Sequence, residues 1–134
     1  KGVDGCFKFA QVGGSSGILL DGERMKEIPT PKTVGTGSIF VANEGRNVVE
    51  FLSTVAEFFE HESCGKCTPC REGTHRINEI MEKFDFGEGT IGDLELLEEL
   101  ALVMKKASLC GCGQACVNPF LDAMKYFKSE ILSN

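Results

Sequence analysis

Three cysteines at strict two-residue intervals, Cys64, Cys67 and Cys70, constrain this chain more than any other feature. Cys110 follows 40 residues after Cys70, and Cys6, Cys112 and Cys116 bring the total to seven. An odd number of cysteines cannot pair completely within one chain. The chain also opens without the pattern of a secretory signal, so we expect metal or redox chemistry rather than a disulfide framework.

The spacing of these cysteines favours one kind of metal site. Thiolates are soft ligands that suit both zinc and iron–sulfur clusters. Zinc sites usually draw on two separated Cys-x-x-Cys pairs around one ion. Three ligands in one loop, completed by one remote cysteine, are typical of a 4Fe–4S cube, in which each iron takes one thiolate. A structural zinc module and a metal-free redox sensor remain the alternatives.

The residues around the cysteine loop agree with a negatively charged group. Pro69 is suited to the first turn of a helix, so Cys67 and Cys70 flank a helix N-terminus, where the macrodipole favours thiolates. Gly65 permits close approach of the backbone, or serves simply as a turn residue. Lys66 brings positive charge that tunes a cluster, or is an ordinary solvated lysine.

Composition excludes several classes of protein. The 134 residues, 42% hydrophobic and 25% charged, are typical of a globular chain with one compact domain or a small pair. The net charge of −6 argues against a nucleic-acid partner, which requires clustered basic residues. No apolar run approaches the ~18–20 residues of a membrane span. An acidic stretch is expected to be a solvated helix face: Glu88, Asp93, Glu95, Glu98 and Glu99.

The character of the sequence changes near residue 45. Residues 1–45 are rich in glycine and proline, and the short apolar stretches Ile18–Leu20 and Ser38–Ala42 predict strands. From residue 46 onward, apolar residues recur at three- and four-residue steps, as on one face of a helix. The sequence therefore predicts a mainly α chain whose helical part, 46–134, follows a small β segment.

Four helices are predicted within residues 46–134. The first begins after an Asn47 cap and ends near His61, and the second begins at Pro69 and ends before Gly87. Thr90 with Asp93 caps the third helix, and an Asn118 cap followed by a first-turn proline opens the fourth. Amphipathic helices with short connections bury their apolar faces most simply as a four-helix bundle.

Two segments resemble a known family. Residues 62–74, Glu-Ser-Cys-Gly-Lys-Cys-Thr-Pro-Cys-Arg-Glu-Gly-Thr, are similar to the cluster signature of the NADH-binding flavoprotein subunit of respiratory complex I. The same signature occurs in diaphorase subunits of NAD(P)-linked bifurcating hydrogenases and formate dehydrogenases. Residues 108–111, Ser-Leu-Cys-Gly, resemble the motif that carries the fourth cluster ligand. Residues 13–17 and 35–38 resemble the end of the family's ubiquitin-like β-grasp domain, which assigns 1–45 to a partial β-grasp segment.

The resemblance covers essentially the whole chain and implies electron relay. In this family, flavin mononucleotide (FMN) takes a hydride from NAD(P)H and passes electrons singly to the cluster, which forwards them to iron–sulfur centres of a partner subunit. The chain has no matching nucleotide-binding segment. We therefore expect it to be the C-terminal portion of a longer polypeptide, whose flavin domain is its neighbour, or a separately encoded cluster module. The expected location is the cytoplasm, including the periphery of a membrane complex.

The resemblance also assigns residues. Cys64, Cys67, Cys70 and Cys110 are the expected cluster ligands, Gly65 and Lys66 the expected cofactor contacts, and no residue of this segment alone is expected to be catalytic. The sequence departs from the family at Cys112, where leucine is more usual, and at Cys116, where the residue is small. Cys112 is therefore held as a reserve ligand. His61 and His75 are expected on helix surfaces rather than at the metal.

Overall fold

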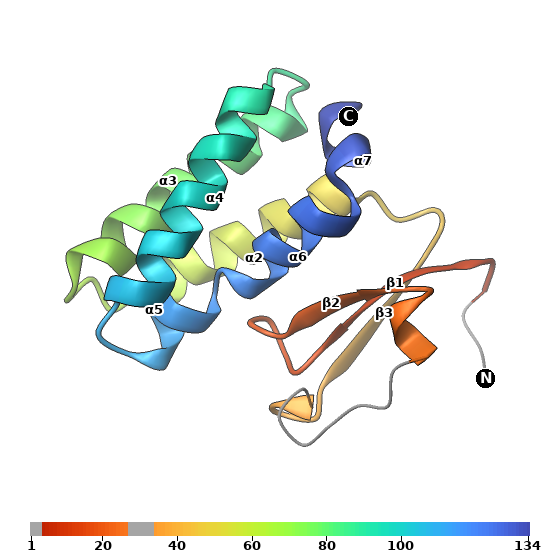
Figure 1. Cartoon of the computed structure of the whole chain (residues 1–134), viewed down its shortest axis with the longest axis horizontal. Coiled ribbons are helices and arrows are strands. Elements are labelled where there is room, and N and C mark those ends of the chain that lie inside the picture. The colour runs from red at the N-terminus through yellow and green to blue at the C-terminus, as the bar shows by residue number, and fades with distance from the viewer. Residues whose placement is uncertain (1–3, 27–33) are drawn as a thin grey trace.

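The computed structural model describes residues 4–26 and 34–134. A three-stranded sheet lies beside a set of helices (Figure 1). The strands are β1 (Phe7–Val12), β2 (Ile18–Asp21) and β3 (Ile39–Asn43), with a 3₁₀ turn at Arg24–Lys26. The helices are α2 (Val48–Glu62), α3 (Thr68–Asp85), α4 (Ile91–Ala107), α5 (Gly111–Ala115), α6 (Asn118–Tyr126) and α7 (Lys128–Leu132). The predicted mainly helical class is confirmed.

The sheet is antiparallel, in the order β2-β1-β3. Both predicted strands are present, but the central strand β1 is not one that the sequence predicted. Its Gln11 pairs with Leu19 on one side and Phe40 on the other. Gln11 is 5% exposed, and its side chain donates to the Ser15 carbonyl over 2.8 Å, which satisfies a buried polar group in the central strand.

Local capping fixes the starts of α2 and α4. The Asn47 side chain accepts hydrogen bonds from the N–H groups of Val49, at 2.7 Å, and Glu50, at 3.4 Å. Thr90 and Asp93 form a reciprocal capping box at the start of α4. These caps place α2 and α4 where the sequence predicts them.

The fourth predicted helix needs correction. Asn118 does not cap it: its side chain donates to the Ser16 carbonyl and accepts from Lys105 Nζ, at 3.1 and 3.2 Å. The helix is interrupted at Phe127, whose backbone leaves the helical region, and resumes as the short α7. The five-residue α5 is a further helix that the periodicity did not predict. The bundle therefore has four longer helices, α2, α3, α4 and α6, and two short ones.

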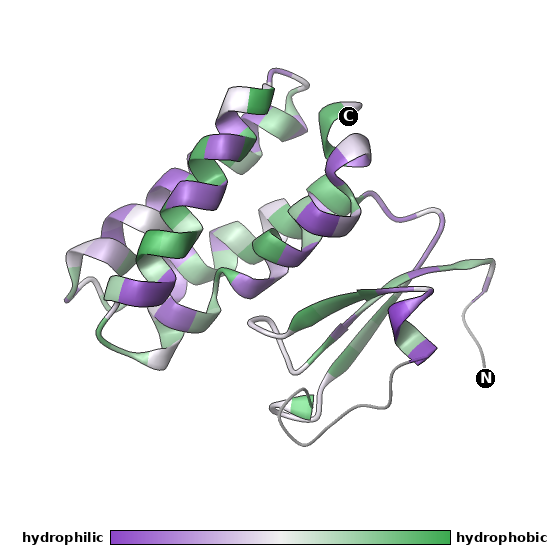
Figure 2. Cartoon of the chain, viewed as in Figure 1, coloured by the Kyte–Doolittle hydropathy of each residue, from purple (hydrophilic) through white to green (hydrophobic). Residues whose placement is uncertain are grey.

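One hydrophobic core joins the sheet to the helices. The long helices carry alternating hydrophobic and hydrophilic bands (Figure 2), and the predicted apolar stripes of α3 and α4 are buried, with Leu100 only partly so. Phe9 of β1 is fully buried and makes edge-to-face contacts with Phe51 and Phe127, at ring distances of 5.1 and 5.8 Å. The aromatic rings thus connect β1, α2 and the end of α6.

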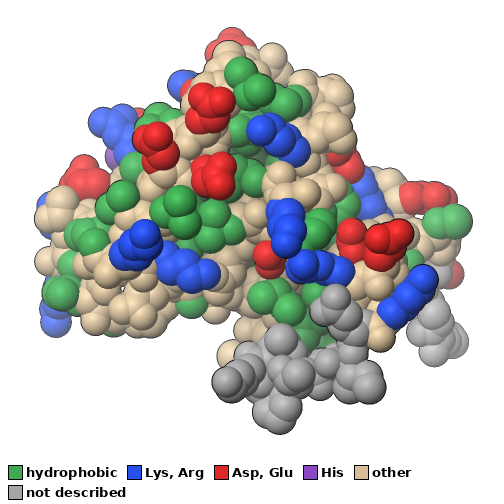
Figure 3. Space-filling model, in the orientation of Figure 1, with side chains coloured by type: hydrophobic (Ala, Val, Ile, Leu, Met, Phe, Trp, Pro, Cys, Tyr) green, Lys and Arg blue, Asp and Glu red, His purple; other side chains and the backbone are tan. Residues whose placement is uncertain are grey.

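The surface carries both signs of charge. On the face shown in Figure 3, acidic and basic side chains are interspersed with apolar ones. The acidic stretch of α4 is solvated as expected, except that Asp93 is partly buried by its pairing with Lys83. Among the described residues, no helix combines the length and apolar character needed to cross a membrane.

Candidate metal centre

The three-cysteine loop connects α2 to α3. Gly65 has φ +71°, a left-handed conformation that other residues rarely adopt, and this reverses the chain just after α2. Arg71 Nη1 then donates to the Gly65 carbonyl over 2.9 Å and ties the loop back to α3. Cys64 is exposed, Cys67 partly buried at the N-cap position, and Cys70 buried in the first helical turn.

The segment that contains Cys110 is distant in sequence from this loop but packs next to it. Figure 1 shows α5 at the end of the bundle where α3 begins. The approach is close: a Cβ added to Gly113 would lie 2.9 Å from Cβ of Cys70. Cys110, exposed at the N-cap position of α5, is thereby brought to the same end of the molecule as Cys64, Cys67 and Cys70.

Hydrogen-bond donors are directed at the loop sulfurs. Backbone hydrogen bonds lower the pKa of Cys67, the largest effect coming from Leu109 and the next from Cys70. Burial acts in the opposite direction. The Ser63 hydroxyl lies 3.4 Å from the Cys70 sulfur. The Leu109 contact crosses between the two cysteine segments, so the segments stabilise a thiolate at Cys67 jointly.

The remaining cysteines have different surroundings. Burial raises the pKa of Cys112, and the nearby sulfurs of Cys70 and Cys110 raise it further. Burial also raises the pKa of Cys116 to about 12, and this side chain is part of the hydrophobic core. Cys6 is exposed and lies just before β1 in the chain. Cys116 therefore packs as a small apolar side chain.

The candidate donors are the soft sulfurs of two cysteine segments. Among the residues that the structure describes, no three His, Cys, Asp or Glu side chains converge closely enough to hold a single metal ion. Four cysteines nevertheless lie in the two segments that meet at one end of the bundle, where the Ser108 hydroxyl is also buried. Such soft donors match a polynuclear iron–sulfur group.

The other residues singled out from the sequence occupy the surface. Lys66 is exposed on the loop. His75 Nδ1 lies 2.6 Å from a Glu60 carboxylate oxygen, linking α3 to α2, and this hydrogen bond raises the pKa of His75. His61 is exposed at the end of α2. Both histidines are therefore on helix surfaces, as the sequence predicts.

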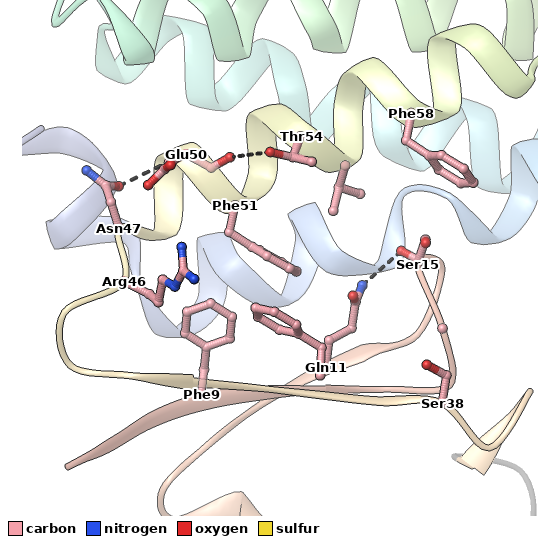
Figure 4. A pocket seen from close by; sticks show the side chains of 13 residues that line it. Phe9, Gln11, Ser15, Ser38, Arg46, Asn47, Glu50, Phe51, Thr54 and Phe58 are labelled. Carbon is pink, nitrogen blue, oxygen red and sulfur yellow. Dashed lines mark hydrogen bonds between the residues drawn. The ribbon is translucent and has the colours of Figure 1, made fainter. Parts of the chain in front are cut away.

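A cavity of about 480 Å³ lies between the sheet and α2 (Figure 4). Its walls are largely apolar and include Phe40, Phe51 and Phe58. Gln11 and Ser15, joined by their hydrogen bond, form a polar corner. None of its lining residues is a cysteine or histidine, so this cavity is separate from the candidate metal centre.

Ser108 is a residue of this region that sequence reasoning did not single out. The resemblance places it in the Ser-Leu-Cys-Gly motif, but only the fold shows its hydroxyl buried beside the cysteine loop. The Ser-Leu-Cys-Gly motif at residues 108–111 is the sequence signal that points to Ser108.

Comparison with known proteins agrees with this geometry. Residues 50–134 match the family described as the NADH-ubiquinone oxidoreductase-F iron-sulfur binding region. The chain is 36% identical over 132 residues to the NADP-reducing hydrogenase subunit HndC of Solidesulfovibrio fructosivorans, covering 93% of this chain and 27% of that protein. The mitochondrial NADH-ubiquinone oxidoreductase 51 kDa subunit of Neurospora crassa is 32% identical over 113 residues, covering 84% of this chain and 22% of that protein.

A solved structure shows the same fold. An NAD⁺-reducing NiFe-hydrogenase in the H₂-reduced state aligns with a TM-score of 0.83 and 34% identity, over 96% of this chain and 23% of that one. The chain thus spans less than a third of the length of these relatives. The family match confirms the resemblance and the 4Fe–4S cofactor expected from the sequence. The chain belongs to the NADH-ubiquinone oxidoreductase-F iron-sulfur binding family.

Proposed function

We propose that the chain relays electrons through one 4Fe–4S cluster held by Cys64, Cys67, Cys70 and Cys110. The observation that carries this proposal is the packing of α5 on α3, where Gly113 meets Cys70 and brings the remote cysteine to the three-cysteine loop. When bound, such a cluster supplies one-electron transfer without bond chemistry.

The chain's own residues hold and shape this site. The N-terminus of α3 and the backbone N–H groups that donate to the Cys67 sulfur favour negative charge, so they stabilise thiolate ligands. Gly65 makes the turn between Cys64 and Cys67. Arg71 stabilises that turn by donating a hydrogen bond to the Gly65 carbonyl. We assign Lys66 the role of adding positive charge near the cluster from an exposed position.

We further propose that the chain is one component of an NAD(P)H-linked oxidoreductase. FMN and NAD(P)H would bind to a flavin domain of the same polypeptide, and iron–sulfur subunits would accept or supply electrons. Residues 1–45 would be the end of a β-grasp segment and 46–134 the cluster domain, in a cytoplasmic protein. Support comes from the relatives, which are named as subunits of NADP-reducing hydrogenase and NADH-ubiquinone oxidoreductase.

Metal and acid-labile sulfide analysis tests the cluster proposal. The chain is purified anaerobically, and its iron, zinc and sulfide are measured together with its visible absorption. We expect a brown protein with about four iron atoms and four sulfide ions per chain. About one zinc without sulfide would replace the proposal with a structural zinc module. Titratable thiols with neither metal nor sulfide would replace it with a metal-free redox sensor.

A further inference from the structure

The Ser108 side chain is buried without a hydrogen-bond partner. Ser108 is 5% exposed at the end of α4, and its Oγ has no partner among the described residues. Its backbone is fully used, since its N–H donates to Met104 over 3.0 Å and its carbonyl accepts from Gln114 over 2.9 Å. Buried hydroxyls usually find a partner, so this one needs an explanation.

The hydroxyl occupies space that Gly113 leaves open. A Cβ added to Gly113 would lie 2.5 Å from the Ser108 Oγ, as well as 2.9 Å from Cβ of Cys70. The hydroxyl therefore lies at the contact between α5 and the three-cysteine loop.

We propose that the Ser108 hydroxyl is a further cofactor-binding group, which donates a hydrogen bond to a sulfur of the cluster site at the contact between α5 and the three-cysteine loop. The inference rests on the proposed cluster and adds a residue to its site. It explains why a polar side chain is buried here and why a glycine stands opposite it. A cluster held at this contact would supply the sulfur acceptor that the Ser108 hydroxyl lacks.

The consequence of such a hydrogen bond concerns the reduction potential. Reduction adds one electron to the cluster and makes it more negative, while no bond forms or breaks. A hydrogen-bond donor stabilises the more negative form more strongly, so it raises the potential. Removing the hydroxyl should therefore shift the potential in the negative direction.

The test compares midpoint potentials of cluster-loaded chains by redox titration monitored by electron paramagnetic resonance. Ser108→Ala should retain iron and sulfide but titrate at a more negative potential, and Ser108→Thr, which keeps the hydroxyl, should titrate as the wild type. Ser53→Ala is the matched control, because Ser53 also buries an unpartnered hydroxyl, but about 14 Å along α2 from its end at the loop. Its potential should not change.

The outcomes separate this inference from the proposed function. An unchanged potential in Ser108→Ala, or an equal shift in Ser53→Ala, would overturn the inference and leave the cluster proposal intact. A wild-type chain without iron and sulfide would overturn both. If Ser108→Ala loses its helical circular dichroism, Ser108→Cys decides: its weaker donor should give a smaller negative shift, and no shift would overturn the inference.

Discussion

Cys110 and Cys112 lie two residues apart but differ in their surroundings. Cys110 is exposed at the start of α5, whereas Cys112 is half-buried against the core and has a raised pKa. The thiolate is the form that binds metal, so the more accessible Cys110 is the better fourth ligand.

Alanine substitutions distinguish these two cysteines. Cys110→Ala should lose most of the cluster, because one iron loses its thiolate, while Cys112→Ala should keep it. Iron and acid-labile sulfide per chain measure the effect after anaerobic reconstitution. Retention in Cys110→Ala together with loss in Cys112→Ala would reverse the assignment and make Cys112 the ligand.

Residue-scale chemistry was predictable only in part. The cysteine spacing named the candidate ligands, because ligand type and interval are local properties of the sequence. The role we propose for Ser108 was not predictable, since its burial depends on Gly113 packing against Cys70, a contact between segments about 40 residues apart.

The elements that carry the cysteines depend on close helix packing. Gly73 of α3 faces Met104 of α4, and a Cβ at Gly73 would overlap the Met104 thioether. Gly73 is buried in the middle of α3, a position where glycine usually weakens a helix. Its lack of a side chain allows α3 and α4 to pack closely there.

Gly73→Ala should therefore destabilise the chain by about 1–3 kcal/mol, the usual cost of overpacking, reduced where Met104 can change rotamer. Urea unfolding followed by circular dichroism measures this. Gly92→Ala, on the solvent side of α4 with no side-chain atom nearer than 3.7 Å, is the control and should be neutral or slightly stabilising. Equal effects of the two substitutions would show that the α3–α4 contact has room for a methyl group.

The His75–Glu60 pair between α3 and α2 should make stability depend on pH. The Glu60 hydrogen bond raises the pKa of His75 above 6.5, so the protonated form is favoured in the folded state. The contribution of the pair to the free energy of unfolding is fully present below pH 6.5. It is lost as the pH rises through the pKa that His75 has in the folded state. His75→Gln should thus lower the urea midpoint more at pH 5.5 than at pH 8.5.

Lys83→Gln provides the reference for that experiment. Lys83 pairs with Asp93, whose pKa is lowered to about 2 by this lysine and by Thr90. The Asp93 carboxylate therefore stays charged across the range tested, so the effect of Lys83→Gln should be equal at the two pH values. A His75→Gln effect that is equally constant would contradict the assigned protonation of His75.

At the element scale, local signals were sufficient where caps decide the boundaries. Asn47 and Thr90 bond to their own helices, so α2 and α4 begin where the sequence predicts. Asn118 failed as a predicted cap because its partners, Ser16 and Lys105, are distant in sequence. β1 was missed because Lys8 and Gln11 interrupt its apolar pattern; the Lys8 amine bonds to Arg46 and Glu130, which only the fold brings near.

At the scale of the whole molecule, Asp122 joins the helices to the sheet. Its carboxylate on α6 accepts a hydrogen bond from the Leu19 N–H of β2 over 2.9 Å. Burial raises the pKa of Asp122, and the Leu19 bond only partly opposes this. The Asp122 carboxyl therefore binds a proton more tightly in the folded state than in the unfolded chain. Its contribution to stability falls as the pH rises toward and through the pKa of Asp122 in the folded state.

Asp122→Asn should accordingly be as stable as the wild type or more so at pH 7, because the amide oxygen still accepts from Leu19 without a buried charge. Its advantage should shrink as the pH falls from 7 toward 4, because the wild-type carboxyl takes up its proton in the folded state above its ordinary pKa of 3.8. Asp122→Leu leaves the Leu19 N–H unpaired and should cost about 1–3 kcal/mol. Urea unfolding at both pH values checks this. A large loss of stability in Asp122→Asn at pH 7 would mean that the charge itself is needed.

The central claim for the molecule is that two distant cysteine segments, joined by α5 packing on α3, hold one 4Fe–4S cluster. The most direct measurement is the electron paramagnetic resonance spectrum of the anaerobically purified chain after chemical reduction. We predict the signal of a single reduced 4Fe–4S cluster, lost in Cys64→Ala, Cys67→Ala and Cys70→Ala. A reduced chain without such a signal and without bound iron would contradict the claim.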